Sequence, residues 1–145
     1  AGTGIVHSEY NKSLTEPVKL LQLWVVTGEK NVTPRYEEAT VEIKDLENKL
    51  VNIVSPKDLG GKTWIHQNAW FHLGNFKKDF SFEYEIKQNV NGNKNGLYVF
   101  IIEGSAKVGS DSLNTRDAIG LTEAEKVEIT AVSDLKILLV EVPMA

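Results

Sequence analysis

Cysteine is absent from this chain of 145 residues. The absence excludes disulfide bridges, thiolate metal sites and thiol nucleophiles together. It is compatible with a reducing compartment, and the chain opens without the basic segment and apolar core of a secretory signal peptide. We therefore expect a cytoplasmic protein.

Long apolar runs and clustered positive charge are also missing. No apolar stretch approaches the roughly 20 residues of a membrane-spanning helix, so we expect no membrane partner. The 16 Lys and Arg residues are scattered, and the formal net charge is −4. Phosphate backbones are bound by clustered Lys and Arg, whereas the tightest cluster here, "FKKD" at 76–79, is typical of a solvated turn. The sequence therefore predicts no direct nucleic-acid partner.

Apolar and polar residues alternate through most of the chain. In "FSFEYEI" (80–86), aromatic and aliphatic side chains alternate with Ser and Glu, as in a strand with one buried and one solvated face. The segment "KVEITAV" (126–132) follows the same pattern. Three denser runs, "VKLLQLWVV" (18–26), "LYVFII" (97–102) and "LKILLVEV" (135–142), are typical of strands covered on both faces.

Turn-forming segments such as "SPKDLGGK" (55–62) and "NVNGNKNG" (89–96) separate these runs. Only "EEATVEIKDLENKL" (37–50) has charges at helical spacing, and its β-branched residues leave its structure open. The sequence therefore predicts an all-β chain of roughly ten short strands, in a sandwich or a barrel.

One domain boundary is expected at Thr33-Pro34, where a proline ends any strand and the composition turns polar. Residues 34–145 have enough strands for a compact β domain of their own. Residues 1–33 do not, since two or three strands need a partner sheet.

His7 and Glu9 form the sharpest candidate pair for metal binding. Residues two apart in a strand point to the same face, so this imidazole and this carboxylate would project together. Such donors suit Fe(II), Zn, Mn or Ni. Two ligands seldom make a site, however, and spacing alone favours a surface pair on an edge strand.

His66 and His72, in "WIHQNAWFHLGNF" (64–76), are the other two histidines. No H-x-H or H-x-x-E-H spacing joins them, so each is expected to be a hydrogen-bonded core or strand-face histidine. A small apolar pocket with one polar histidine is the alternative, and the sequence leaves their role open. The chain also lacks the G-x-S-x-G of serine hydrolases, and "AGTG" (1–4) lacks the Lys-Ser/Thr ending of a phosphate-binding loop.

Several segments together resemble the pirin family of two-cupin proteins. They are "AGTGIVHSEYN" (1–11), "LQLWVV" (21–26), "NVTPRYEE" (31–38), "LVNIVSP" (50–56), "WIHQNA" (64–69) and the run from Tyr98 to Pro143. The resemblance spans essentially the whole chain in order. It implies a cupin-type β-barrel or sandwich at 34–145, the C-terminal cupin of a bicupin, preceded at 1–33 by extra strands left from the N-terminal, metal-binding cupin.

The resemblance also implies a divided metal site. In pirin-like proteins the first cupin holds a metal, usually iron, through three histidines and one glutamate, and two of those histidines form an H-x-H. His7 and Glu9 would be the remaining two ligands, with Glu9 also the catalytic proton acceptor. Because this chain has no H-x-H, we expect Fe(II) or another divalent metal in the full-length protein and none bound here. The second cupin, with no histidine in "GLTEAEKVEITAV" (120–132), is expected to hold no metal.

By this resemblance the full-length protein is a metal-dependent dioxygenase of quercetin-like flavonols, and this C-terminal piece is inactive by itself. The alternative is a non-enzymatic, iron-binding regulatory protein that acts through protein contacts, which the acidic charge fits better than contact with DNA. A third role is structural, with the second cupin supporting the first. The physiological substrate and the identity of the metal stay open.

The run at 18–26 also predicts an assembly. Without the sheet to which it belongs, it would expose an apolar strand face and an open edge. We expect it to pack onto the second cupin or to pair with the same segment of another chain in a homodimer.

Overall fold

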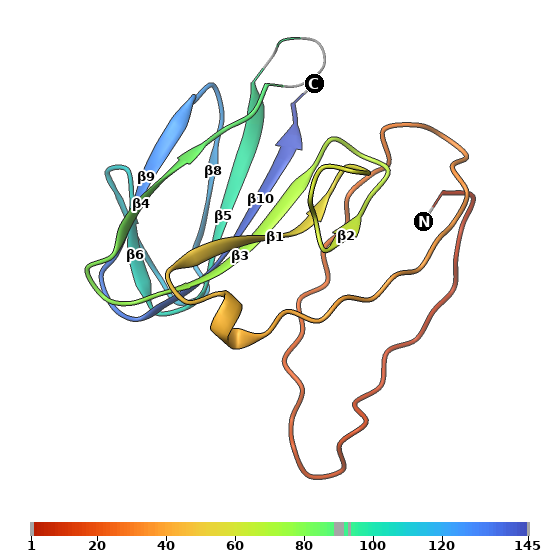
Figure 1. Cartoon of the computed structure of the whole chain (residues 1–145), viewed down its shortest axis with the longest axis horizontal. Coiled ribbons are helices and arrows are strands. Elements are labelled where there is room, and N and C mark those ends of the chain that lie inside the picture. Colours follow the sequence, from red (N-terminus) through yellow and green to blue (C-terminus); the bar gives the residue numbers. More distant parts are fainter. Residues whose placement is uncertain (1, 89–91, 93, 145) are drawn as a thin grey trace.

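Two β-sheets make up the body of the protein, in a computed structural model that describes residues 2–88, 92 and 94–144 (Figure 1). One sheet has the strand order β2-β1-β3-β10-β5-β8, and the other has the order β4-β9-β6-β7. All neighbours are antiparallel except β1 and β2. The elements are η1 (Ile43–Asp45), β1 (Lys49–Ser55), β2 (Thr63–Trp64), β3 (Trp70–Phe76), β4 (Ser81–Glu85), β5 (Asn95–Glu103), β6 (Ser105–Val108), β7 (Asp111–Asn114), β8 (Ala118–Leu121), β9 (Lys126–Ala131) and β10 (Leu135–Pro143).

The alternating runs become strands, as the sequence predicts. In β4, Tyr84 is buried while its neighbours Glu83 and Glu85 are exposed. In β9, Val127 and Ile129 are buried while Glu128 is exposed. The predicted turn at 55–62 is irregular chain between β1 and β2, whereas part of the predicted turn at 89–96 lies outside the described residues.

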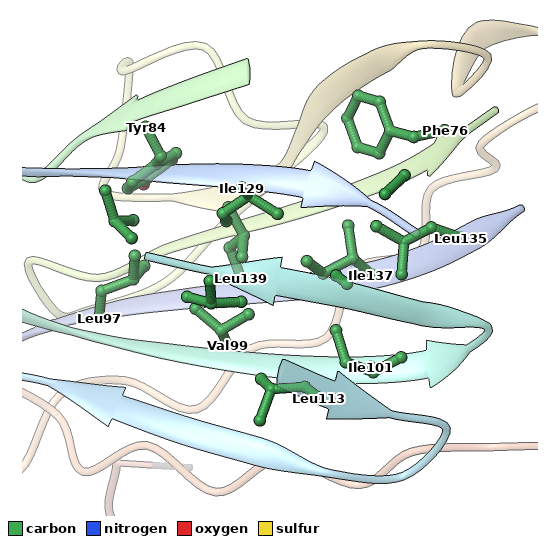
Figure 2. Packing of buried hydrophobic residues seen from close by; sticks show 14 of the residues in the cluster. Phe76, Tyr84, Leu97, Val99, Ile101, Leu113, Ile129, Leu135, Ile137 and Leu139 are labelled. Carbon is green, nitrogen blue, oxygen red and sulfur yellow. The ribbon is translucent and has the colours of Figure 1, made fainter. Parts of the chain in front are cut away.

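The main core lies between the two sheets. Figure 2 shows aliphatic and aromatic side chains from both sheets filling this space. The buried members of this cluster are Phe76, Tyr84, Ile86, Leu97, Val99, Ile101, Ala106, Val108, Leu113, Val127, Ile129, Ala131, Leu135, Ile137 and Leu139. Burial of this apolar surface is the main contribution to the stability of the sandwich.

The large sheet is also covered, in part, on its outer face. Apolar residues of β1, β3, β5 and β10, together with Ala69 just before β3, form a second cluster with one residue of the N-terminal segment, Val25. Its buried members are Ala69, Phe71, Leu138 and Val140. This second layer explains why β5 and β10 are apolar at nearly every position, as the sequence predicts for strands covered on both faces.

The extra N-terminal strands expected at 1–33 are not present in residues 2–42, which form no strand. Figure 1 shows this segment, in red to orange, as a long open loop beside the large sheet. The prediction of a strand at 18–26 is therefore wrong for this structure. A strand needs a neighbour for its backbone hydrogen bonds, and no strand of either sheet pairs with this segment.

Residues 37–50, whose structure the sequence leaves open, form one short helical turn. The 3-10 turn η1 occupies Ile43–Asp45, and β1 begins at Lys49. Among the described residues, no helix has the length and apolar character that crossing a membrane requires.

Candidate functional site

The side chains of His7 and Glu9 lie close together on the N-terminal segment. His7 Nε2 is 3.5 Å from Glu9 Oε1, and the two side chains are 58% and 50% exposed. An imidazole and a carboxylate are suitable donors for a divalent metal. In the described part of the chain, however, no group of three or more His, Asp or Glu residues is placed to hold one. The structure therefore brings together the predicted pair and adds no further ligand to it.

Local hydrogen bonds fix the chain on both sides of this pair. Before it, the backbone N–H of Thr3 donates to the carbonyl of Val32 over 3.2 Å. After it, Asn11 and Ser13 build a turn in which the Ser13 hydroxyl accepts from the backbone N–H of Glu16 over 2.8 Å. The turn follows from the tendency of Asn and Ser side chains to bond nearby backbone groups.

A second part of the N-terminal segment docks on the "WIHQNA" region. The guanidinium of Arg35 lies 4.0 Å from the centre of the Trp64 ring and donates to the Trp64 carbonyl over 2.6 Å. The Gln67 amide donates to the Val26 carbonyl over 3.0 Å. These contacts join three of the segments that carry the resemblance: "NVTPRYEE" through Arg35 and "LQLWVV" through Val26, both to "WIHQNA".

His66 is half-buried in this docking region. Its ring meets the Trp64 ring edge-on at 4.7 Å, and its backbone carbonyl accepts from the N–H of Gly28 over 2.8 Å. His66 also lines a cavity of about 490 Å³ together with Glu29, Gln67 and other residues. The cavity lining mixes polar residues with apolar ones such as Ile65 and Met144, so it is less apolar than the pocket that the sequence leaves as an alternative.

His72 lies between the two sheets, in a polar cluster that the sequence analysis did not identify. Its Nδ1 is 3.3 Å from the hydroxyl of Tyr84, and the two rings meet edge-on at 5.3 Å. The Tyr84 hydroxyl in turn donates to Glu141 Oε2 over 2.7 Å. His72 is therefore a hydrogen-bonded strand-face histidine, as expected, and its partner Tyr84 joins it to a buried carboxylate.

Glu141 is the centre of this polar cluster and is completely buried. Its Oε1 accepts from the backbone N–H of Lys87 over 2.8 Å and from the Asn95 amide over 2.7 Å. Its Oε2 accepts from Tyr84 and from the Lys87 ammonium, the latter over 3.2 Å. A buried carboxylate is tolerated only with such partners. The signal in the sequence was a single acidic residue inside the dense apolar run 135–142.

The surroundings shift two pKa values in this cluster. Burial and the neighbouring Lys87 ammonium lower the pKa of His72 from 6.5 to about 4, with the Glu141 charge opposing them. Burial and the hydrogen bond to Glu141 raise the pKa of Tyr84 well above its ordinary value. At neutral pH the imidazole is therefore uncharged and the phenol is protonated.

An apolar groove of about 380 Å³ runs between the N-terminal segment and the outer face of the large sheet. Its walls are residues 21–25 on one side and residues of β5 and β10 on the other. Several apolar side chains of the segment are nonetheless exposed, among them Leu20 at 58%, Trp24 at 89% and Val26 at 84%. The segment thus rests on the sheet with Val25 partly buried, while most of its other apolar side chains stay exposed.

Comparison with known proteins supports the fold and the resemblance. The model of the family described as "Quercetinase C-terminal cupin domain" matches residues 52–142. A protein of Escherichia coli K12 named quercetin 2,3-dioxygenase is 29% identical over 143 residues, which are 99% of this chain and 58% of that protein. This chain therefore spans little more than half the length of that curated relative.

Two solved structures share the fold. The crystal structure of YhhW from Escherichia coli has a TM-score of 0.73 at 20% identity and covers 84% of this chain and 49% of its own. A structure described as bacterial pirin YhhW in complex with nickel(II) has a TM-score of 0.71 at 20% identity, with 82% and 48% covered. With the family match, these likenesses confirm the predicted cupin-type β-sandwich.

Proposed function

This chain belongs to the quercetinase C-terminal cupin family of pirin-like proteins, and we propose that it forms part of a longer, metal-dependent dioxygenase that acts on quercetin-like flavonols. The name of the Escherichia coli relative supports the reaction, and the nickel(II) complex of YhhW supports a role for a divalent metal. The shared length supports the view that this chain supplies only part of such a protein, since it matches 58% of the relative.

His7 and Glu9 are the residues that we assign to the metal. Their separation of 3.5 Å places an imidazole nitrogen and a carboxylate oxygen side by side, and this observation carries the proposal. A metal held there would supply a Lewis-acid centre for dioxygen and substrate. Glu9 adds a carboxylate that receives the proton released from the flavonol hydroxyl.

The same geometry argues that the chain does not perform the reaction alone. A redox-active metal needs several ligands in fixed positions, with open positions for substrate and dioxygen. His7 and Glu9 are half exposed on a segment without strands, and no third ligand stands beside them in the described residues. We therefore assign residues 1–33 to the metal-binding cupin and residues 34–145 to the second cupin, and we expect Fe(II) only when the remaining ligands are present.

The test compares this chain with a longer one that adds the first half found in the relatives. Loaded with Fe(II), the longer protein should consume quercetin, seen as loss of its visible absorption, whereas this chain should retain little iron and show no turnover. Replacing His7 with Ala or Glu9 with Gln should abolish turnover in the longer protein. The matched change Glu16→Gln, an exposed carboxylate of the same segment, should leave it intact.

Two results would overturn the proposal. Near-stoichiometric iron with turnover in this chain alone would show that the assigned site is complete without further ligands. If the longer protein neither consumed nor bound flavonols, the non-enzymatic alternative would replace the dioxygenase. The exposed apolar side chains at 20–26 would then be a surface for protein contacts.

A further inference from the structure

The strand β2 has an open backbone edge in the part of the chain that the structure describes. It stands at the end of the large sheet, where it pairs with β1 (Figure 1). The N–H of Ile65 donates to the Ser55 carbonyl over 2.9 Å, so the residue after Trp64 directs its N–H to β1. Since successive residues of a strand direct their backbone groups to opposite sides, the N–H and the carbonyl of Trp64 point to the open edge.

Two charged side chains cover this edge in place of a strand. Arg35 donates to the Trp64 carbonyl over 2.6 Å, and the Trp64 N–H donates to Glu37 Oε2 over 3.3 Å. Arg35 and Glu37 also pair with each other, and the guanidinium lies 4.0 Å from the centre of the Trp64 ring. Hydrogen bonds of charged groups and the contact of a guanidinium with an indole ring are both favourable. Both backbone groups of Trp64 are thereby satisfied by side chains that are two residues apart.

The same contacts fix the point at which the N-terminal segment joins the sandwich. Val32 lies three residues before Arg35, and its carbonyl accepts from the N–H of Thr3 over 3.2 Å. Gly2 has a φ of 57° and lies against the same carbonyl, which a Cβ at this position would overlap. His7 follows Thr3 by four residues. Two short stretches of chain and one backbone hydrogen bond therefore connect Arg35 to the candidate metal ligands.

Two further hydrogen bonds attach the segment to the residues that follow β2. The N–H of Gly28 donates to the His66 carbonyl over 2.8 Å, and the Gln67 amide donates to the Val26 carbonyl over 3.0 Å. All these attachments contact residues 64–67, directly or through Arg35. The positions of His7 and Glu9 thus depend on how firmly this one region holds the segment, because residues 2–33 form no strand.

We propose that Arg35, Glu37 and Trp64 form a latch that holds the segment 2–33 against the sandwich and thereby positions His7 and Glu9 for the metal. The three are positioning residues, which act through the backbone of the segment and not as ligands. The proposal rests on the proposed function, in which His7 and Glu9 bind the metal. Metal ligands must be held within about 0.5 Å of their productive positions, and residues that orient them from outside have large effects on affinity.

The first experiment tests the latch in this chain, without metal. Arg35→Ala removes the hydrogen bond to Trp64, the pair with Glu37 and the contact with the indole ring. Amide hydrogen exchange of Thr3 and Gly28, whose N–H groups are bonded to Val32 and His66, should accelerate about fivefold or more. Exchange in β5 and β10 should not change, because their hydrogen bonds belong to the sandwich itself.

Two further variants define what the latch needs. Arg35→Lys keeps a cation beside the Trp64 ring but loses the planar fork that reaches two partners, and it should accelerate exchange at Thr3 by an intermediate amount. Lys126→Ala removes another surface pair, with Glu83 at 2.9 Å, and should leave exchange at Thr3 and Gly28 as it is. If Arg35→Ala does not fold, Arg35→Lys carries the test.

The second experiment measures metal affinity in the longer protein that adds the first half found in the relatives. Co²⁺ is titrated and followed by calorimetry and by its visible absorption, which reports the geometry of the ligands. Arg35→Ala should weaken binding about tenfold or more and change the absorption spectrum, although exchange in β5 and β10 shows the sandwich to be intact. Arg35→Lys should recover part of the affinity, and Lys126→Ala should bind Co²⁺ as the unmodified protein does.

Three results would overturn the latch. One is rapid exchange of Thr3 and Gly28 in the unmodified chain, and another is exchange that Arg35→Ala does not change. The third is a longer protein that binds Co²⁺ equally well with and without Arg35, while His7→Ala abolishes binding. If His7→Ala itself had no effect on Co²⁺ binding, the assignment of the metal ligands would fail and with it the positioning role. The exchange rates would then still decide whether the latch holds the segment, so the two failures are distinguishable.

Discussion

Two apolar runs of nearly equal density have opposite fates in this molecule. The run 135–142 is β10, which pairs with β3 on one side and β5 on the other and is buried along most of its length. The run 18–26 forms no strand, and most of its side chains are exposed. An apolar run therefore indicates that a segment tends to be buried in a sheet. A strand forms only where a neighbouring strand also supplies hydrogen-bond partners for its backbone.

The two regions also hold their polar pairs differently. His7 and Glu9 are half exposed on the N-terminal segment and contact solvent. His72 and Glu141 are joined through Tyr84 between two sheets, and the carboxylate has no exposed surface. The first pair can contribute to a site only with groups from elsewhere, whereas the second is fixed by the fold itself.

The largest effect should come from matched truncations in the two runs. Leu139, which is completely buried in β10, and Leu20, which is 58% exposed, are both replaced with Ala. Leu139→Ala should lower the free energy of unfolding by about 2–5 kcal/mol through lost burial and a cavity. Leu20→Ala should change it by no more than about 0.5 kcal/mol.

Chemical denaturation of both variants measures this difference. Equal losses would show that the segment 18–26 is packed as firmly as β10, contrary to the exposure of its side chains. A loss near zero for Leu139→Ala would mean that the contacts between the sheets are not the main source of stability.

A smaller effect on the free energy of unfolding should distinguish His72 from His7 as pH falls. The folded state holds the pKa of His72 at about 4, below its ordinary value of 6.5, because burial and Lys87 disfavour the charged imidazole, while Glu141 partly opposes them. Between these two values the unfolded chain binds a proton that the folded chain does not, so stability is lost as pH falls from about 6.5 to about 4.

For this partly accessible group the loss should be on the order of 1–3 kcal/mol after allowance for solvent screening. The variant His72→Gln should flatten the dependence of the unfolding free energy on pH in this window. The matched control is His7→Gln, at an exposed histidine outside the sandwich. The measurement is the slope of the unfolding free energy against pH, not the absolute stability. An unchanged slope in His72→Gln would contradict the burial of His72 beside Lys87.

Much of the sandwich follows from the sequence. Period-two alternation locates β4 and β9, and dense apolar runs locate β5 and β10, because each pattern reflects which faces of a strand meet the core. The resemblance to pirin-like proteins leads to the family and to the pair His7 and Glu9. The polar cluster was missed because it is assembled from β3, β4, β10 and the segment after β4, which are far apart in the sequence. A single Glu in an apolar run indicates something unusual but does not identify its partners.

The absence of a strand at 18–26 could not be predicted either, because it depends on a partner that the local residue pattern does not show. Residue preferences there favour a strand, but the neighbouring strand would have to come from outside the described fold. The prediction of a homodimer through this segment follows from that gap: a second copy offers an identical run with matching open backbone. We propose this pairing for the chain in isolation.

The smallest effect on stability, with a clear effect on assembly, is therefore expected from Trp24→Glu. Trp24 is 89% exposed, so the change should alter the free energy of unfolding at low protein concentration by no more than about 0.5 kcal/mol. It should nonetheless weaken association, because it places a charge where two apolar segments would meet. Sedimentation of the unmodified chain should show a dimer at high concentration, and Trp24→Glu should shift it to monomer, while Tyr36→Glu, another exposed aromatic position before the sandwich, should not. A strictly monomeric unmodified chain would show that the run 18–26 remains exposed without a partner, and the comparison between the two runs would then be one of stable burial against stable exposure.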